Sequence, residues 1–169
     1  EANDSMRRDH MTGAFNRKSY DEKLGEHWRL YQHDPKPICL LTLDIDHFKK
    51  VNDTYGHALG DFILIECVKM LQSHFSEKGQ VVSRIGGEEF TILLPETETR
   101  EAEKTVKGFL AKVRKEIFIE GNQQLSFTMS CGIAELCREE SAEEWMKRSD
   151  DALYEAKENG RNQVQSSVF

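Results

Sequence analysis

A nearly unbroken apolar run at residues 38–43, which reads ICLLTL, constrains the fold more than any other part of this chain. Such a run suits a central strand that is buried on both faces of a sheet. It leads directly into Asp44-Ile45-Asp46, and a carboxylate at the end of a buried strand is costly unless something neutralises it. Asp46 has a structural alternative as the N-cap of a following helix. Asp44 is harder to explain in that way, and carboxylates in such positions commonly hold Mg²⁺.

The remainder of the chain alternates between helical and extended patterns. These patterns predict helices over residues 15–31, 48–51, 58–75, 97–117 and 141–159, and strands over 81–85, 90–94, 125–136 and 164–169. Residues 52–56 have the composition of a loop. Because a tight hairpin interrupts the alternation, we expect an α/β (α+β) fold with a central mixed, partly antiparallel sheet flanked by helices. We expect residues 1–8 to be a linker or the remnant of an upstream helix, and residues 9–169 to form one domain.

Charge and cysteine content exclude some classes of partner. With 23 Lys and Arg against 30 Asp and Glu, the net charge is −7, which argues against a surface that coats nucleic acid. No apolar stretch approaches the roughly 20 residues of a membrane-spanning helix, so we expect no membrane contact from this segment. The four cysteines form no CxxC pair, and three of them (Cys39, Cys67 and Cys131) lie in apolar runs, as buried thiols do. This cysteine usage favours a cytoplasmic location.

A second acidic group lies at the tip of the predicted hairpin, in Gly86-Gly87-Glu88-Glu89. Two glycines suit a tight turn because they tolerate positive φ. Two adjacent carboxylates repel each other, and a purely structural turn has no need of them. If Asp44 lies on a neighbouring strand, Glu88 or Glu89 would complete a carboxylate cluster for one or two metal ions. A plain structural turn is the alternative from these residues alone.

Five ordered stretches resemble the GGDEF family of diguanylate cyclases. Residues 84–90, RIGGEEF, match its RxGG(D/E)EF motif. The others are similar to the family's DxLTGLxNR, DxDxFKxxND…GHxxGD, TxSxGxA and DxALYxAKxxGRN blocks, and they lie at residues 9–17, 43–61, 128–134 and 149–162. The match covers about residues 9–164, with Met11 and Ala14 replacing two family leucines. It implies the palm-like fold of nucleotidyl cyclases.

The resemblance implies a reaction and its central residues. Members of this family join two GTP molecules into cyclic di-GMP and release two pyrophosphates. Carried over, Asp44, the carbonyl of Ile45 and Glu88 would hold Mg²⁺, with Mn²⁺ as the alternative metal. Glu88 would also help to deprotonate the attacking 3′-hydroxyl, and Glu89 would support the metals. Lys49 matches the lysine that stabilises the transition state.

The resemblance also implies residues that bind the substrate. Asn52 and Asp61 occupy the guanine-reading positions, and a carboxylate can accept two hydrogen bonds from the N1 and N2 edge of guanine, which adenine lacks. His57 aligns with a further substrate contact.

Phosphate-binding positions follow from the same match. Lys157 and Arg161 correspond to the pair that grips the terminal phosphates, although without the motif a solvated helix face would be the favoured explanation for them. The backbone around Phe48, at a helix start, suits phosphate binding through free N–H groups.

One departure from the family pattern concerns product inhibition. The family's inhibitory RxxD lies five residues before the glycine pair, and residues 77–80 here read EKGQ. A carboxylate in place of that arginine would repel product phosphate, so we expect no product inhibition through this site.

Three functional interpretations remain open from the sequence. The favoured one is an active cyclase that uses GTP, works as a homodimer and follows an upstream sensory domain. The second is a catalytically silent, GTP-binding regulatory module, and the third is another nucleotidyl cyclase on a related sheet. The intact GGEE residues count against the second, and Asp61 counts against the third.

Overall fold

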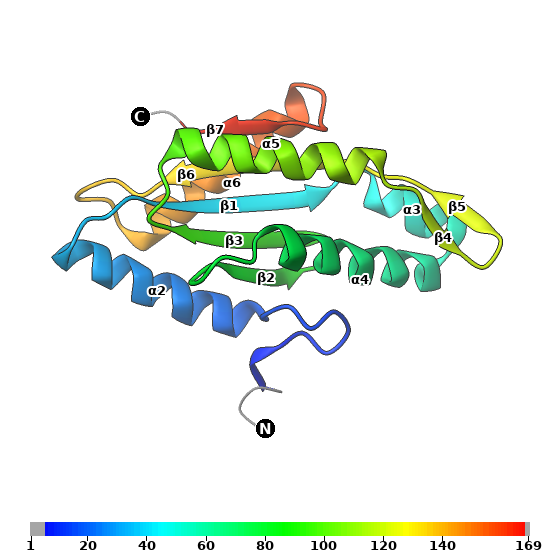
Figure 1. Ribbon diagram of the computed structural model, residues 1–169, viewed down its shortest axis with the longest axis horizontal. Coiled ribbons are helices and arrows are strands. Elements are labelled where there is room, and N and C mark those ends of the chain that lie inside the picture. Colours follow the sequence, from blue (N-terminus) through cyan, green and yellow to red (C-terminus); the bar gives the residue numbers. More distant parts are fainter. Residues whose placement is uncertain (1–5, 168–169) are drawn as a thin grey trace.

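The computed structural model describes residues 6–167, and helices and strands are interspersed along the chain (Figure 1). In chain order they are α2 (Arg17–His33), β1 (Ile38–Ile45), α3 (Phe48–Tyr55), α4 (His57–His74), β2 (Val81–Gly86), β3 (Glu89–Pro95), α5 (Thr99–Lys115), β4 (Phe118–Glu120), β5 (Gln123–Leu125), β6 (Met129–Glu135), α6 (Ala142–Glu158) and β7 (Val164–Ser166).

The main sheet has the strand order β2-β3-β1-β6-β7. Strand β1 pairs antiparallel with both β3 and β6, and β2 pairs antiparallel with β3. Only the outer pair, β6 and β7, is parallel within the described chain. The sheet is therefore mixed and mostly antiparallel, which confirms the predicted fold class.

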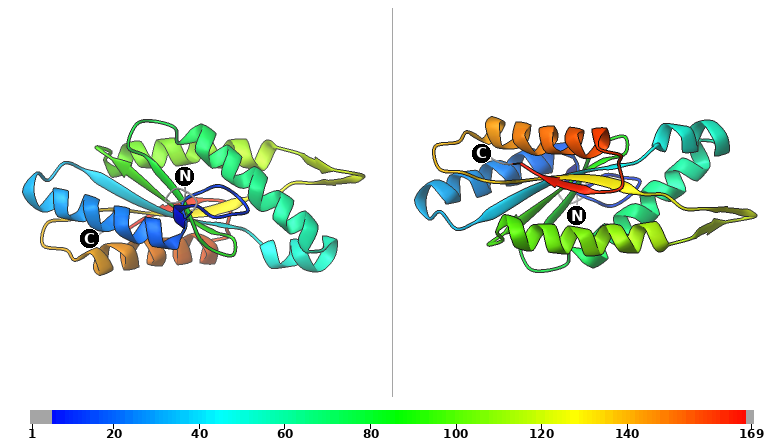
Figure 2. Two further views of the ribbon diagram at one scale, coloured as in Figure 1. Left: turned by 90° about the horizontal axis from the view of Figure 1, so that it is seen from below. Right: turned by 90° about the horizontal axis from the view of Figure 1, so that it is seen from above.

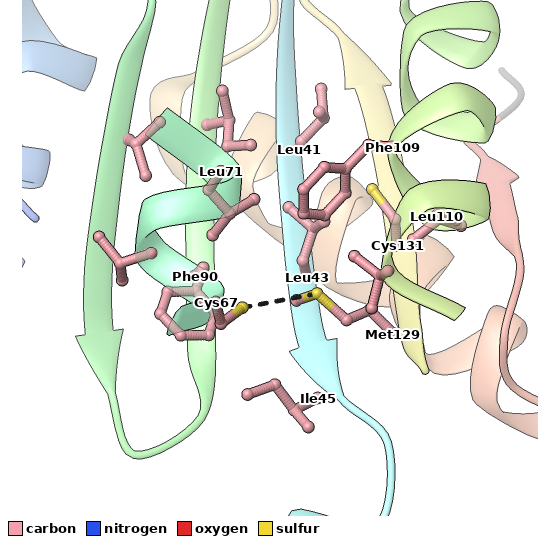
Figure 3. Packing of buried hydrophobic residues seen from close by; sticks show 14 of the residues in the cluster. Leu41, Leu43, Ile45, Cys67, Leu71, Phe90, Phe109, Leu110, Met129 and Cys131 are labelled. Atoms are coloured by element: carbon pink, nitrogen blue, oxygen red, sulfur yellow. Dashed lines mark hydrogen bonds between the residues drawn. The ribbon is translucent and has the colours of Figure 1, made fainter. Parts of the chain in front are cut away.

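Strand β1 lies at the centre of the molecule because all eight of its residues are buried. Helices α4 and α5 cover one face of the sheet, and α2 and α6 cover the other (Figure 2). Successive side chains of a strand point to opposite faces. Leu41 and Leu43 accordingly join the core under α4 and α5 (Figure 3), whereas Leu40 packs with Tyr20 and Trp145 on the α2 and α6 side.

Three of the four cysteines are buried, as predicted. Cys39, Cys67 and Cys131 are buried, and all four cysteines are free thiols. The sulfur of Cys67 lies 3.6 Å from that of Met129 inside the core (Figure 3). Burial raises the pKa of the Cys67 thiol, which keeps it protonated and unreactive.

The loop predicted over residues 52–56 is wrong, because α3 continues to Tyr55. Polar residues gave those positions a loop-like composition, but the helix needs only one apolar side and exposes the rest. It ends at Gly56, whose φ of 92° lies in the region that favours glycine and whose N–H bonds to the Asn52 carbonyl at 2.8 Å.

The single strand predicted over residues 125–136 is also wrong. Its beginning belongs to the β4–β5 hairpin, which extends beyond the end of the main sheet (Figures 1 and 2). Phe118 stacks on Phe127 at a ring distance of 5.0 Å, which anchors the hairpin's base to the body. The Gly121-Asn122 pair between the strands is a two-residue hairpin signal that the sequence carried and the prediction missed.

The described part of the predicted linker is tied to the domain. The Arg7 carbonyl accepts hydrogen bonds from the Asn16 N–H and the Ser19 hydroxyl, both at 2.8 Å. Residues 1–5 of that linker, and the last two residues of the predicted strand 164–169, lie outside the described residues. Within residues 6–167, no helix is both long and apolar enough to cross a membrane.

Replacement of Gly132 by alanine is expected to destabilise the fold severely. A Cβ at this β6 position would lie 2.2 Å from the Leu153 nitrogen and 2.4 Å from the Ser149 carbonyl oxygen, so α6 would have to move off the sheet. We expect a loss of about 3 kcal/mol in the free energy of unfolding, measured by urea denaturation. Gly108→Ala on α5 is the matched control, because its Cβ meets nothing closer than 3.7 Å. The control should gain up to about 1 kcal/mol. Equal effects of the two substitutions would contradict this packing account.

Candidate active site at the end of the central strand

The register of the sheet brings the predicted metal ligands together. Asp44, at the end of β1, lies opposite Glu89 of β3 and opposite Ser130 of β6. Residues opposite each other share one face, so the Asp44 and Glu89 carboxylates are neighbours. The Ile45 N–H donates to the Glu88 carbonyl at 3.3 Å, which attaches the tip of the β2–β3 hairpin to the strand end.

Asp44 is a buried carboxylate with one oxygen left over. The residue is 8% exposed, and its Oδ2 accepts a hydrogen bond from the Lys157 ammonium. Its Oδ1 is buried and has no hydrogen-bond partner. Burial raises the pKa of Asp44; Lys157 opposes this shift, and the nearby charges of Glu88 and Asp46 add to it. A second positive charge beside Oδ1 would give this oxygen a partner and offset the cost of burying the carboxylate charge.

The Glu89 carboxyl lies in the same buried and acidic surroundings. Burial, followed by the charges of Asp44 and Asp150, raises the pKa of Glu89 to about 7, although Lys157 and Arg17 act in the opposite direction. The carboxyl therefore holds a proton part of the time near neutral pH. This is the behaviour of an acidic site in which a counter-charge would be favourable.

The hairpin tip is held by a motif arginine. Arg84 donates from Nε to the Gly87 carbonyl at 2.8 Å and pairs through Nη1 with Asp9 Oδ1 at 3.1 Å. Asp9 in turn accepts hydrogen bonds from the Thr12 N–H and hydroxyl, at 2.9 and 2.7 Å. The opening segment of the chain thus braces the turn that carries Glu88. The sequence comparison found both residues but assigned them no role.

The predicted guanine-reading residues lie on the α3–α4 helical hairpin. Asn52 of α3 is half-buried against α4, where a Cβ on Gly60 would lie 1.9 Å from Asn52 Oδ1. A side chain at position 60 would therefore displace the Asn52 amide, and the exposed Asp61 follows Gly60 directly. His57, also exposed, begins α4.

The predicted phosphate-binding residues come from two helices. Phe48 begins α3 and buries its ring in the core, and no side chain caps the first N–H groups of this helix. Lys49 is exposed on the first turn. Lys157 lies near the end of α6 and reaches Asp44, whereas Arg161 follows the helix and is exposed.

The interpretation of Asp46 as a helix N-cap is wrong. His47 is the N-cap of α3, in a left-handed conformation with φ of 58°. Asp46 instead accepts hydrogen bonds from Thr128, Ser130 and Asn162. No sequence signal pointed to these partners, which lie more than 80 residues away along the chain.

Few groups at the end of β1 are available to bind a metal ion. Across residues 6–167, no group of three or more His, Cys, Asp or Glu side chains is arranged to hold a metal ion. The predicted set combines the carboxylates of Asp44, Glu88 and Glu89 with the backbone carbonyl of Ile45, and it stays a prediction.

Comparison with known proteins identifies the family. The family described as "Diguanylate cyclase, GGDEF domain" matches residues 6–163. The chain belongs to the GGDEF family. The predicted family membership and palm-like cyclase fold are thereby confirmed.

Named relatives and solved structures agree with this membership. The GGDEF domain is 39% identical over 156 residues to diguanylate cyclase DgcM of Escherichia coli, covering 92% of this chain and 37% of that protein. It is 37% identical to diguanylate cyclase VdcA of Vibrio cholerae, covering 92% of this chain and 45% of VdcA. The chain thus spans less than half the length of these relatives.

Two solved GGDEF domains superimpose closely on the chain. The GGDEF domain of DgcB from Caulobacter crescentus, in complex with c-di-GMP, gives a TM-score of 0.93 at 32% identity, covering 97% of this chain and 94% of that one. The active GGEEF domain of a diguanylate cyclase from Vibrio cholerae gives 0.84 at 30% identity, covering 91% and 97%.

The brace between Asp9 and Arg84 predicts a defined pH dependence of stability. Partial burial disfavours the charged carboxylate, but the hydrogen bonds from Thr12 and the charge of Arg84 outweigh it and lower the pKa of Asp9. A lowered pKa contributes stability above the unfolded-state pKa, near 3.8, and this contribution is lost as the pH falls further. Asp9→Asn should therefore cost about 1–3 kcal/mol at pH 7 and much less at pH 3, measured by urea unfolding.

Asp21→Asn is the control for this measurement. Its ion pair with Arg17, at 3.4 Å, is exposed on α2, so the substitution should cost less than about 0.5 kcal/mol. A difference between wild type and Asp9→Asn that stays constant from pH 7 to pH 3 would exclude the brace.

Proposed function

We propose that this GGDEF domain is an active diguanylate cyclase, which condenses two GTP molecules into cyclic di-GMP and two pyrophosphates. The observation that carries the proposal is the buried Asp44 carboxylate, with one oxygen unpartnered, beside the hairpin that presents Glu88 and Glu89. The intact GGEE tip also supports activity, since a relative whose domain is described as active has the same GGEEF motif.

The strand end fits a divalent cation. Mg²⁺ prefers oxygen ligands, and Asp44, Glu88 and the Ile45 carbonyl would supply them, with Glu89 in support. Mn²⁺ would suit the same donors. When bound, the metal neutralises phosphate charge and acidifies the attacking hydroxyl.

The side chains of this chain perform the remaining steps. Glu88 would accept the proton of the 3′-hydroxyl as its oxygen attacks the α-phosphorus and pyrophosphate leaves. The Lys49 side chain makes no hydrogen bond or ion pair with another described residue, so its ammonium is available to stabilise the negative charge that develops. Phe48 would contribute backbone N–H groups to the phosphates, and Lys157 and Arg161 would hold the terminal ones.

Guanine selection would come from the α3–α4 hairpin. Asp61 is exposed and can accept from both N1–H and N2–H of guanine, while Asn52, fixed against Gly60, would contact the same base. His57 would add a contact at the start of α4. Adenine offers no matching donors on that edge, which favours GTP over ATP.

Catalysis by this arrangement needs two domains. Each would bind one GTP and supply the 3′-hydroxyl that attacks the other's α-phosphate, which requires a two-fold symmetric homodimer. We further propose an upstream sensory domain and a cytoplasmic site of action. The greater length of the relatives supports the first, and one neighbour, SiaD of Pseudomonas aeruginosa, is seen in complex with its activator SiaC.

The absence of product inhibition through the RxxD position stays a prediction. Residues 77–80 form an exposed turn in which the Gln80 side chain accepts from the Glu77 N–H at 3.1 Å. Neither residue offers a cation to a phosphate.

Product analysis tests the proposed activity. Concentrated protein incubated with GTP and Mg²⁺ should yield cyclic di-GMP, resolved by mass, and Glu88→Gln should reduce the rate at least about a hundredfold, because it removes a base and a ligand. Glu155→Gln, on the exposed face of α6, is the control and should retain wild-type activity. Tight GTP binding without product, even in a fusion that forces dimerisation, would overturn the proposal and favour a regulatory module.

Dilution tests the requirement for two domains. Because the isolated chain is expected to be mostly monomeric, activity per subunit should rise with protein concentration and approach proportionality at the dilute end. A fused coiled coil should abolish this dependence. Activity per subunit that stays flat on dilution of the unfused chain would contradict the expectation.

A further inference from the structure

Asp46 makes an unusually complete set of contacts for a carboxylate near a proposed metal site. It is 5% exposed, and its Oδ1 accepts from the Ser130 hydroxyl at 2.7 Å. Its Oδ2 accepts from the Thr128 hydroxyl at 2.6 Å and from the Asn162 backbone N–H at 3.0 Å. Three donors thus compensate the burial of its charge. Thr128 directly precedes β6, Ser130 lies at the start of β6, and the Asn162 N–H belongs to the turn after α6, so Asp46 joins these segments to the end of β1.

The turn after α6 adopts a conformation that needs such support. Helix α6 ends at Glu158, and Gly160 follows with φ of 117°. The Arg161 N–H bonds to the Ala156 carbonyl at 2.9 Å, and the Gly160 N–H bonds to the Lys157 carbonyl at 3.4 Å. Arg161 and Asn162 then follow with φ of 62° and 51°. Two successive non-glycine residues in the left-handed region are unfavourable and persist only where their surroundings hold them.

Asp46 supports the backbone of this turn, while Arg114 Nε donates to the Asn162 side chain at 3.2 Å and Gln163 Nε2 donates to the Arg161 carbonyl at 3.1 Å. The Asn162 N–H is shared between Asp46 Oδ2 at 3.0 Å and the Ser130 hydroxyl at 3.1 Å. Ser130 is itself oriented by its hydrogen bond to Asp46. Removal of the carboxylate would therefore weaken both acceptors of that N–H, and the turn could relax to ordinary extended backbone.

The direction of the Arg161 side chain depends on this turn. Its side chain is exposed, and its guanidinium makes no hydrogen bond or ion pair with another described residue, so the backbone conformation sets the direction in which this flexible side chain leaves the chain. We propose that Asp46 is a positioning residue that holds the turn and thereby aims Arg161 at the terminal phosphates of the nucleotide. This inference rests on the proposed function, because that function gives Arg161 its phosphate.

The expected loss of nucleotide affinity depends on how often the turn adopts its binding conformation. If the supported turn is the conformation that binds, a variant that adopts it one-tenth of the time binds about tenfold more weakly. This loss of affinity applies only to ligands that contact Arg161. A guanine nucleotide without terminal phosphates would bind equally well to both conformations.

A double-mutant cycle tests the proposal by calorimetry. Affinities of a non-hydrolysable GTP analogue and of GMP would be measured, with Mg²⁺ present, for wild type, Asp46→Asn, Arg161→Met and the double variant. We expect Asp46→Asn to weaken the GTP analogue about tenfold and to change GMP less than twofold. The same substitution should have little further effect in the Arg161→Met background.

Two further variants separate positioning from general damage to the fold. Thr128→Val removes one donor to Asp46 but leaves the contact with Asn162, so it should lower the melting temperature without a selective loss for the GTP analogue. Ser130→Ala keeps the carboxylate and removes the second acceptor of the Asn162 N–H. It should show the same selective loss on a smaller scale, and it serves if Asp46→Asn fails to fold.

Distinct results would overturn the proposal and its premise. Additive losses from Asp46 and Arg161, or equal weakening of the GTP analogue and GMP, would show that Asp46 does not act through Arg161. If Arg161→Met left affinity for the GTP analogue unchanged, the phosphate-binding role in the proposed function would itself be wrong for this residue.

Discussion

The burial of Asp44 at the end of the central strand is the constraint on which the rest of the site depends. A carboxylate that is 8% exposed, with one oxygen unpartnered, is unfavourable in the fold unless positive charge is brought to it. Lys157 supplies one such charge from α6. Burial, together with the charges of Asp44 and Asp150, raises the pKa of Glu89 to about 7 in spite of this ammonium. The strand end therefore carries the negative charge that the proposed cation site requires.

The surrounding fold holds the parts of this site at fixed positions. Antiparallel pairing sets Glu89 opposite Asp44, and the Arg84 brace fixes the hairpin tip beside them. On the other side of β1, close backbone packing at Gly132 allows α6 to approach the sheet and bring Lys157 to Asp44. The core residues of β1 thus serve the site indirectly, because they set the register that aligns its neighbours.

Sequence reasoning found the features that depend on local pattern. The run at 38–43 predicted β1, and the carboxylates that follow it predicted the location of the site. It was wrong for residues 52–56, where polar composition concealed a helix whose apolar side is only a few residues wide. It was also wrong for Asp46, because Thr128, Ser130 and Asn162 meet this carboxylate only after the sheet and α6 have assembled. Long-range hydrogen bonds of this kind leave no periodicity in the sequence.

Binding of Mn²⁺, followed by electron paramagnetic resonance in the presence of a non-hydrolysable GTP analogue, tests the role of Asp44 most directly. Wild type should bind the ion together with the nucleotide, and Asp44→Asn should bind it at least about tenfold more weakly, since a metal–carboxylate contact is lost. Asp53→Asn, on the exposed side of α3, should bind as wild type does. Unchanged Mn²⁺ affinity in Asp44→Asn would contradict the view that this buried carboxylate organises the site.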